Sequence, residues 1–151
     1  QKLFPYITKL TAITQDRVDQ GVSLLDAYKE MLEKYKSFAT KGEPLFRQIC
    51  EWGALDSSEL KNELIKQGMP ESEWGFGRSS FNIKAMYQMY MDFKRINSRG
   101  GLRTVVKNLQ IPFEPYREEI NGKIKERGFH DARTDAHMTA QVFLKMQSFF
   151  K

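Results

Sequence analysis

A histidine and an aspartate near the C-terminal end have the residue types and the spacing that proton transfer and metal binding require. His130 comes just before the predicted last helix, which runs through His137–Phe150, and Asp135 follows five residues later in the first turns of that helix. An imidazole accepts a proton close to neutral pH, and a carboxylate near a helix N-terminus is favoured by the helix dipole. The segment therefore predicts a general base and a metal-binding carboxylate held on one rigid element.

A second candidate carboxylate, Asp56, follows the predicted strand Leu45–Trp52. In open α/β sheets, ligands bind beyond the carboxyl ends of the strands, so Asp56 occupies a position typical of functional residues. Each candidate also has a purely structural explanation. Asp56 can cap the helix that follows it, and Asp135 can be an exposed acid that interacts with the helix dipole. His130 can simply pack behind Phe129.

Several other kinds of site lack the residues they need. The glycine pair of Gly75–Gly77 is too short for a phosphate-binding loop, and two histidines with one cysteine cannot make a standard structural zinc site. The single cysteine, Cys50, lies in an apolar run, which predicts a reduced, partly buried and unreactive thiol and favours a cytoplasmic, intracellular setting. No apolar run is long enough to predict a membrane span.

The 151-residue chain has a net charge of +5, which favours a polyanionic partner, although a basic soluble protein without such a partner carries the same charge. Basic residues gather around Gly100 and again just before His130, close to the candidate chemistry. The candidates for nucleic-acid binding are Arg99, Arg103, Lys125, Arg127 and Arg133.

Two helices are predicted near the N-terminus. One covers Gln15–Gln20 and is stopped by Gly21. The other is capped by Ser23 and reaches about Phe38, with its apolar residues on one face.

One strand and one helix are predicted next. The short apolar and aromatic run Leu45–Trp52 is typical of a strand. After a turn, Ser57 or Ser58 caps a helix over Glu59–Gln67. Met69–Arg78 carries glycines and a proline and is predicted to be a loop.

The second half of the chain contains three further predicted segments before the last helix. Phe81–Phe93 is a helix whose Met, Tyr and Phe stripe indicates core packing, and Leu102–Leu109 is another helix. Ile111–Arg127 contains prolines, a glycine and many charges, and is predicted to be a mobile loop. Together the elements predict an α/β fold in which residues 1–151 form a single domain without repeats or linkers.

Two segments resemble motifs of the DEDDh 3′–5′ exonucleases. His130–Ala136 resembles the third motif of that family, in which a histidine, four further residues, an aspartate and a small residue enter a helix. Trp52–Asp56, followed by Glu59, resembles the second motif in the branch that includes the KapD sporulation inhibitor and the exonucleases that trim histone mRNA and small RNAs. Leu10–Thr14 and the helices between the motifs are similar to the family in the same order, so the resemblance covers nearly the whole chain.

The resemblance implies an RNase H-like exonuclease fold with a central sheet flanked by helices. The first motif of the family, Asp-x-Glu on the first strand, is absent from this sequence, and the N-terminal strands of the family are missing with it. The resemblance therefore implies that an upstream segment or a partner chain supplies this motif, or that the chain is a degenerate relative that does not cleave.

The resemblance also implies hydrolysis of a terminal phosphodiester with two divalent cations, Mg²⁺ or Mn²⁺. Asp135 would bind the more tightly held cation and Asp56 the second, while His130 would deprotonate the attacking water. The substrate would be the 3′ end of RNA or single-stranded DNA. The aromatic residues that could stack on the terminal bases are Trp74, Phe76 and Phe113.

Two other functions remain open from the sequence. One is a catalytically inactive module on the same fold that binds nucleic acid or a protein partner, which the absent acidic motif favours. The other is a helical scaffold for protein–protein interaction, which predicts no salt-dependent binding of nucleic acid.

Overall fold

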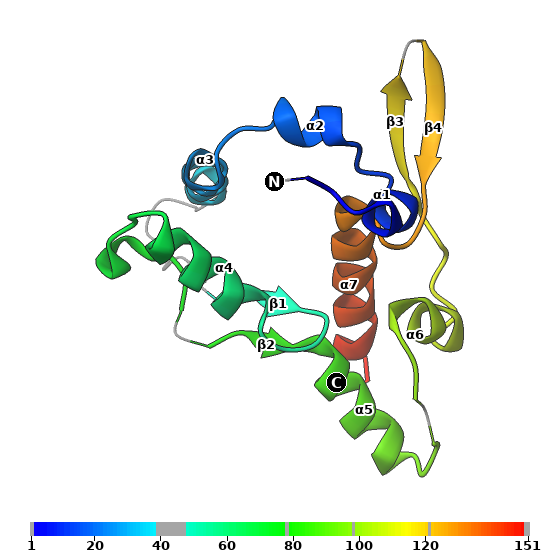
Figure 1. Ribbon diagram of the computed structural model, residues 1–151. Coiled ribbons are helices and arrows are strands. Elements are labelled where there is room, and N and C mark those ends of the chain that lie inside the picture. Colours follow the sequence, from blue (N-terminus) through cyan, green and yellow to red (C-terminus); the bar gives the residue numbers. More distant parts are fainter. Residues whose placement is uncertain (1, 39–47, 78, 98, 121, 150–151) are drawn as a thin grey trace.

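The computed structural model describes residues 2–38, 48–77, 79–97, 99–120 and 122–149. Two short helices, α1 (Pro5–Thr11) and α2 (Gln15–Asp19), form an N-terminal segment that lies beside the N-terminal end of α7 (Ala132–Gln147) (Figure 1). The side chain of Thr14 caps α2 by accepting a hydrogen bond from the backbone N–H of Arg17 at 3.4 Å. The helix predicted over Gln15–Gln20 is therefore confirmed.

The long helix α3 (Leu24–Ser37) follows its sequence signals closely. The Ser23 hydroxyl accepts a hydrogen bond from the backbone N–H of Asp26 at 3.1 Å and so caps the first turn, as predicted. One face of α3 packs on α4 (Asp56–Lys66) and on the segment after it. The buried residues Tyr28, Leu64 and Met69 form the centre of this smaller core, and Leu24, Leu25, Leu32, Leu60, Trp74 and Phe76 pack around them.

The larger core lies between α5 (Ile83–Phe93), α6 (Leu102–Asn108) and α7. The predicted Met and Tyr stripe on α5 supplies Tyr87 and Met91 to it, while Met138 and Val142 come from α7. The Asn82 side chain accepts a hydrogen bond from the backbone N–H of Ala85 at 2.9 Å and starts α5. The core prediction for this region is therefore confirmed.

A small parallel sheet joins the two cores. It pairs β1 (Cys50–Glu51) with β2 (Phe81–Asn82), so the predicted strand is shorter than Leu45–Trp52, of which residues 45–47 lie outside the described chain. The helix predicted over Phe81–Phe93 likewise begins two residues later, because Phe81 and Asn82 pair with β1. Cys50 is exposed, which corrects the prediction of a partly buried thiol.

The helix α4 begins three residues earlier than predicted, at Asp56 instead of Glu59. Ser57 and Ser58 therefore lie within its first turn, and neither is the N-cap. The N-cap residue is Leu55, whose side chain has no oxygen to accept a hydrogen bond. A group from elsewhere in the chain has to satisfy the first N–H groups of this helix.

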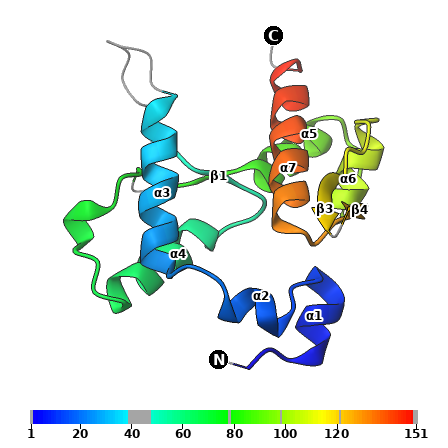
Figure 2. The same cartoon turned by 90° about the horizontal axis from the view of Figure 1, so that it is seen from above.

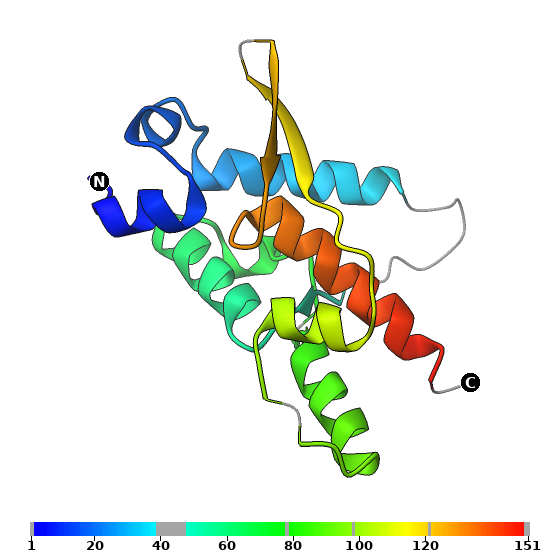
Figure 3. The ribbon, with the colours of Figure 1, turned by 90° about the vertical axis from the view of Figure 1, so that its right-hand side faces the viewer.

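The segment Ile111–Arg127, predicted to be a mobile loop, contains a β-hairpin. Its strands, β3 (Tyr116–Ile120) and β4 (Lys123–Arg127), are antiparallel and project away from the helices (Figures 1 and 3). The fully buried Thr134 hydroxyl fixes the hairpin base to α7: it donates to the carbonyl of Arg127 at 2.8 Å and accepts from the N–H of Tyr116 at 3.1 Å.

The architecture is thus mixed α/β. The described residues form two separate two-stranded sheets and do not form the extended central sheet that was expected. The last helix covers Ala132–Gln147, earlier at both ends than the predicted His137–Phe150, and His130 does lie just before it. In Figure 2, α3 and α7 stand on either side of β1. A hollow of about 720 Å³ lies between these elements, and Ala132, Ala136 and Ala140 of α7 face it.

Candidate functional site

The turn before α7 and the first turn of that helix form one hydrogen-bonded unit. The backbone N–H of His130 donates to both carboxylate oxygens of Asp135, at 3.2 Å each. Asp131 caps the helix, because its Oδ1 accepts from the N–H groups of Arg133 at 3.1 Å and Thr134 at 3.3 Å. His130 has a φ of 77°, in the left-handed region that L-residues disfavour. Asp135 therefore stabilises the backbone of His130 in that conformation and leaves its imidazole exposed.

Asp56 is placed by the buried carboxylate of a different residue. Glu51 on β1 is 5% exposed, and its Oε2 accepts a hydrogen bond from the N–H of Ser57 at 2.9 Å. The same carboxylate accepts a hydrogen bond from the hydroxyl of Ser80, just before β2. Glu51 thus ties both strands of the parallel pair to the start of α4, where Asp56 is the first helical residue and is exposed.

One cleft of about 510 Å³ brings the three predicted chemical residues together. Asp56 from α4 lines it together with His130 and Asp135 from the start of α7. The remaining residues that line this site cleft are Trp52, Gly101, Leu102, Arg103 and Phe129. The fold therefore places the two carboxylates and the imidazole along one concave surface, although the segments that carry them are far apart in the chain (Figure 1).

The Phe129 ring and the Arg103 guanidinium form a wall of the site cleft, and Phe113 lines the neighbouring hollow. Phe129 stacks on Phe113, with 4.8 Å between the ring centroids, and the guanidinium of Arg103 lies 5.2 Å from the centroid of Phe129. His130 is the next residue after Phe129, but its ring is exposed and does not pack behind that phenyl group. Phe113 is 44% exposed, which leaves part of its ring accessible.

The other two aromatic candidates lie elsewhere. Trp74 stacks on Tyr28 with 5.6 Å between the ring centroids, and Phe76 makes an edge contact with Tyr28 at 6.3 Å. Both rings pack against the smaller core, and Phe76 also lines the hollow of about 720 Å³ that Asp56 and Asp135 border.

Three arginines surround the carboxylate of Glu118 at the base of the hairpin; we call these four residues the Glu118 cluster. Arg127 donates to Oε2 from Nε at 3.0 Å and from Nη2 at 2.7 Å. Arg17 Nη2 lies 3.1 Å from Oε1, and Arg133 Nη2 lies 3.7 Å from it. The Arg127 hydrogen bonds, with smaller contributions from the charges of Arg17 and Arg133, hold the pKa of Glu118 below its usual range.

The five arginines and lysines predicted to bind nucleic acid occupy different environments. Arg127 is only 6% exposed and its guanidinium is bound to Glu118, so it is not available at the surface as predicted. Arg103 lines the site cleft, and Arg133 lines two neighbouring hollows. Arg99 and Lys125 are exposed but line none of these hollows.

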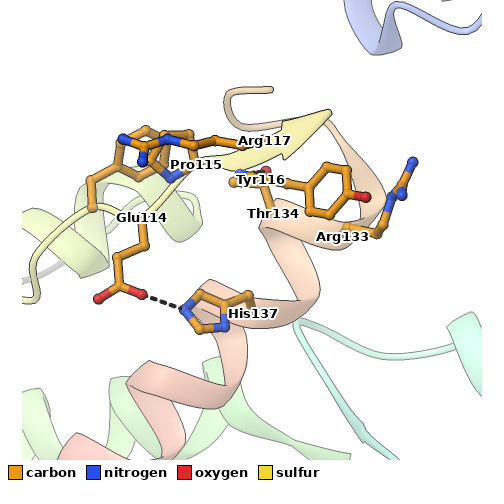
Figure 4. A pocket seen from close by; sticks show the side chains of 8 residues that line it. Glu114, Pro115, Tyr116, Arg117, Arg133, Thr134 and His137 are labelled. Carbon is orange, nitrogen blue, oxygen red and sulfur yellow. Dashed lines mark hydrogen bonds and ion pairs between the residues drawn. The ribbon is translucent and has the colours of Figure 1, made fainter. Parts of the chain in front are cut away.

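His137, the other histidine of the chain, pairs with Glu114. Its Nε2 lies 3.1 Å from Glu114 Oε2, across a hollow of about 570 Å³ (Figure 4). Figure 4 also shows Arg133 and Tyr116 lying side by side on the other side of this hollow. His137 does not line the site cleft, and the two histidines of the chain therefore have different surroundings.

Sequence reasoning missed four residues that shape the site: Glu51, Thr134, Glu118 and Arg17. Glu51 and Thr134 act through hydrogen bonds to residues outside their own elements, for which the local sequence holds no signal. Glu118 and Arg127 are diagonal neighbours on the two strands of a hairpin. The two residues between its strands, Asn121–Gly122, are a typical hairpin-turn sequence that could have revealed it.

Asp56 and Asp135 provide the oxygen ligands that Mg²⁺ and Mn²⁺ prefer. Within the described ranges, however, no three His, Cys, Asp or Glu side chains are grouped closely enough to hold a metal ion by themselves. The donor types therefore fit such a cation, while their number does not complete its coordination.

Comparison of the chain with protein families, with curated proteins and with solved structures finds no match. None of the helices in the described part of the chain has the length and apolar character needed to span a membrane.

Proposed function

We propose that the chain belongs to a metal-dependent 3′–5′ exonuclease of the DEDDh type, with an RNase H-like fold, that hydrolyses terminal phosphodiesters of RNA or single-stranded DNA. One observation supports this most strongly: Asp56, His130 and Asp135 line the same cleft. The wall of that cleft carries the Arg103 guanidinium and the Phe129 ring, which suit a phosphate and a base.

In this proposal Asp56 and Asp135 bind the divalent cations, Mg²⁺ or Mn²⁺. When bound, these cations stabilise the negative charge that develops on the reacting phosphate. Since the described residues offer no complete set of ligands, the remaining oxygens come from water and from the substrate.

His130 accepts the proton of the attacking water in this proposal. Its ring is exposed at the cleft, so it can return the proton to solvent after each cycle. The two hydrogen bonds from its N–H to Asp135 fix the backbone from which the imidazole projects. Asp135 thereby links the position of the base to the position of the cation.

The test measures shortening of a 5′-labelled single-stranded oligonucleotide by the full chain in Mn²⁺, with the products separated on a denaturing gel. His130→Ala removes the general base and should lower the rate by about 10²–10⁴-fold. Asp135→Asn should lower it at least as much, because it removes a cation ligand and half of the charge that would hold the cations.

The chain offers a matched control for each variant. His137→Ala removes the other imidazole, which lies outside the site cleft, and should leave the rate unchanged. Asp92→Asn removes an exposed carboxylate on α5 and should also have no effect. Equal rates in the His130→Ala and His137→Ala variants would refute the assignment of the base.

A second candidate function is a catalytically inactive module that binds nucleic acid or a protein partner. The observation that favours it is the lack of a three-ligand group for a metal ion within the described residues. This module binds a labelled strand without shortening it at any Mn²⁺ concentration, whereas the exonuclease produces a ladder of shorter strands.

A further inference from the structure

A second hollow, of about 510 Å³, lies against the site cleft and shares His130 and Asp135 with it. The N-terminal segment closes one side of this hollow with Leu10, Thr11 and Ile13. Two guanidiniums also line it, those of Arg17 from α2 and Arg133 from α7. We call it the arginine hollow.

The charges of these two arginines are not fully used within the Glu118 cluster. Arg127 already neutralises the Glu118 carboxylate through two short hydrogen bonds, and its side chain is only 7% exposed. Arg17 donates to both oxygens of the same carboxylate, at 3.4 Å and 3.1 Å, and Arg133 lies 3.7 Å from it, but their side chains are 43% and 50% exposed. One carboxylate cannot neutralise three guanidiniums, so these two keep attraction for a further anion.

Two acids also line the arginine hollow, and both are bound by backbone N–H groups. Asp131 accepts from the N–H groups of Arg133 and Thr134, and Asp135 accepts from the N–H of His130. The N-terminus of α7 therefore balances part of their negative charge. The two exposed guanidiniums, although both contact Glu118, can therefore still attract an anion from solvent.

Arg133 is held in place for such an anion. Its guanidinium lies 3.9 Å from the centroid of the Tyr116 ring, and Figure 4 shows the two side chains side by side. Stacking on an aromatic face restrains the planar guanidinium while its N–H groups remain able to donate. Arg133 also borders the hollow of Figure 4, which Phe113 and Tyr116 line, so it stands between that aromatic hollow and the arginine hollow.

We propose that Arg17 and Arg133 form a phosphate subsite, and that its ligand is a phosphodiester group of a single nucleic-acid strand, adjacent to the linkage that reacts in the site cleft. This inference rests on the proposed function, since the cleft defines where the strand ends. The subsite binds the backbone and not the bases, so it discriminates by charge and contributes no sequence preference.

The experiment measures the affinity for a 5′-fluorescein-labelled oligodeoxythymidylate by fluorescence anisotropy, in EDTA and over a range of salt concentrations. Arg17→Gln and Arg133→Gln should each weaken binding about fivefold and reduce the salt dependence by about one phosphate contact. The matched control is Arg95→Gln, which makes the same change in charge at an exposed position beyond the end of α5 and should bind as the unmodified chain does.

The charge-preserving variant Arg17→Lys should keep most of the affinity, because a phosphate also accepts hydrogen bonds from an ammonium group. Arg133→Lys also loses the planar group that stacks on Tyr116, so it should weaken binding. Circular dichroism melting shows whether each glutamine variant is folded. The proposal is overturned if the double glutamine variant is folded and binds as tightly as Arg95→Gln. It is also overturned if Arg17→Lys loses binding as Arg17→Gln does.

EDTA separates this test from the test of the proposed function. If the glutamine variants bind more weakly and the unmodified chain does not shorten the strand in Mn²⁺, the phosphate subsite is supported and the exonuclease activity is refuted. If the unmodified chain shortens the strand and the double glutamine variant binds as tightly as the unmodified chain, the subsite is refuted and the exonuclease activity is supported.

Discussion

The N-terminal ends of α4 and α7 face the same cleft, but the chain holds them in different ways. Each follows a residue with positive φ, 92° at Leu55 and 77° at His130. The start of α7 is capped from within, by Asp131. The start of α4 has no side-chain cap from its own N-cap residue, and the N–H of Ser57 in its first turn depends on Glu51, which comes from β1.

Because of this difference, the N-terminal ends of α4 and α7 depend on different parts of the fold. The unit of His130, Asp131 and Asp135 contains its own hydrogen bonds, so it can form wherever α7 forms. The position of Asp56 depends instead on the pairing of β1 with β2, because Glu51 and Ser80 belong to that region. The positions of His130 and Asp135 are therefore set by the local sequence, and the position of Asp56 is set by tertiary contacts.

Glu51→Ala should have the largest effect on stability. It leaves the partly buried N–H of Ser57 and the hydroxyl of Ser80 without their acceptor, and it should lower the free energy of unfolding by about 2 kcal/mol. Urea denaturation followed by circular dichroism measures this change. Glu59→Ala, which removes an exposed carboxylate from the same helical turn, should change the free energy by less than about 0.5 kcal/mol. Equal losses in the two variants would show that Glu51 is not the cap of α4.

Asp131→Ala should have a smaller effect, a loss of about 1 kcal/mol, because it removes an N-cap that is only partly buried. Asp131→Asn should keep nearly all of the stability, since asparagine is as good an N-cap as aspartate. The same urea titration gives both values. A loss in Asp131→Asn as large as that in Asp131→Ala would point to the charge of Asp131, and not to its cap, as the stabilising feature.

The sequence was sufficient for the parts of the fold that depend on local signals. The Ser23 cap and the apolar face of α3 predicted that helix to within a residue at its C-terminal end. The stripe containing Tyr87 and Met91 predicted the buried face of α5, because residues three or four apart share one side of a helix. The types and spacing of His130 and Asp135 likewise placed both side chains at the start of α7.

The parts that were missed depend on contacts between distant segments. The early start of α4 results from Glu51, and no residue near Asp56 signals it. The hairpin was obscured because Pro112 and Pro115 suggest a loop, while its strands alternate in charge more than in apolar character. The contact of Arg17 with Glu118 joins α2 to β3, and only the folded chain brings these residues together.

Leu55 and His130 both have positive φ, so each can be replaced by glycine and the two variants compared. The expected changes in stability are small. Glycine adopts the left-handed region without strain, so Leu55→Gly relieves about 1–2 kcal/mol of strain and costs about 0.5–1 kcal/mol of chain entropy. Since the Leu55 side chain is 65% exposed, little burial is lost, and the variant should be more stable by about 0.5 kcal/mol. Histidine tolerates this region better than leucine does, so His130→Gly should gain less.

The two glycine variants should differ clearly in activity and only slightly in stability. Leu55→Gly keeps Asp56 at the first position of α4 and should still shorten a labelled strand in Mn²⁺. His130→Gly keeps the backbone N–H that donates to Asp135, so it should remain folded. It should lose the shortening activity, because it has no imidazole to accept the proton. Thermal melting and the strand-shortening gel measure both properties on the same samples. A destabilised Leu55→Gly would mean that the Leu55 side chain makes a stabilising contact, and the start of α4 would then be set locally, as the start of α7 is.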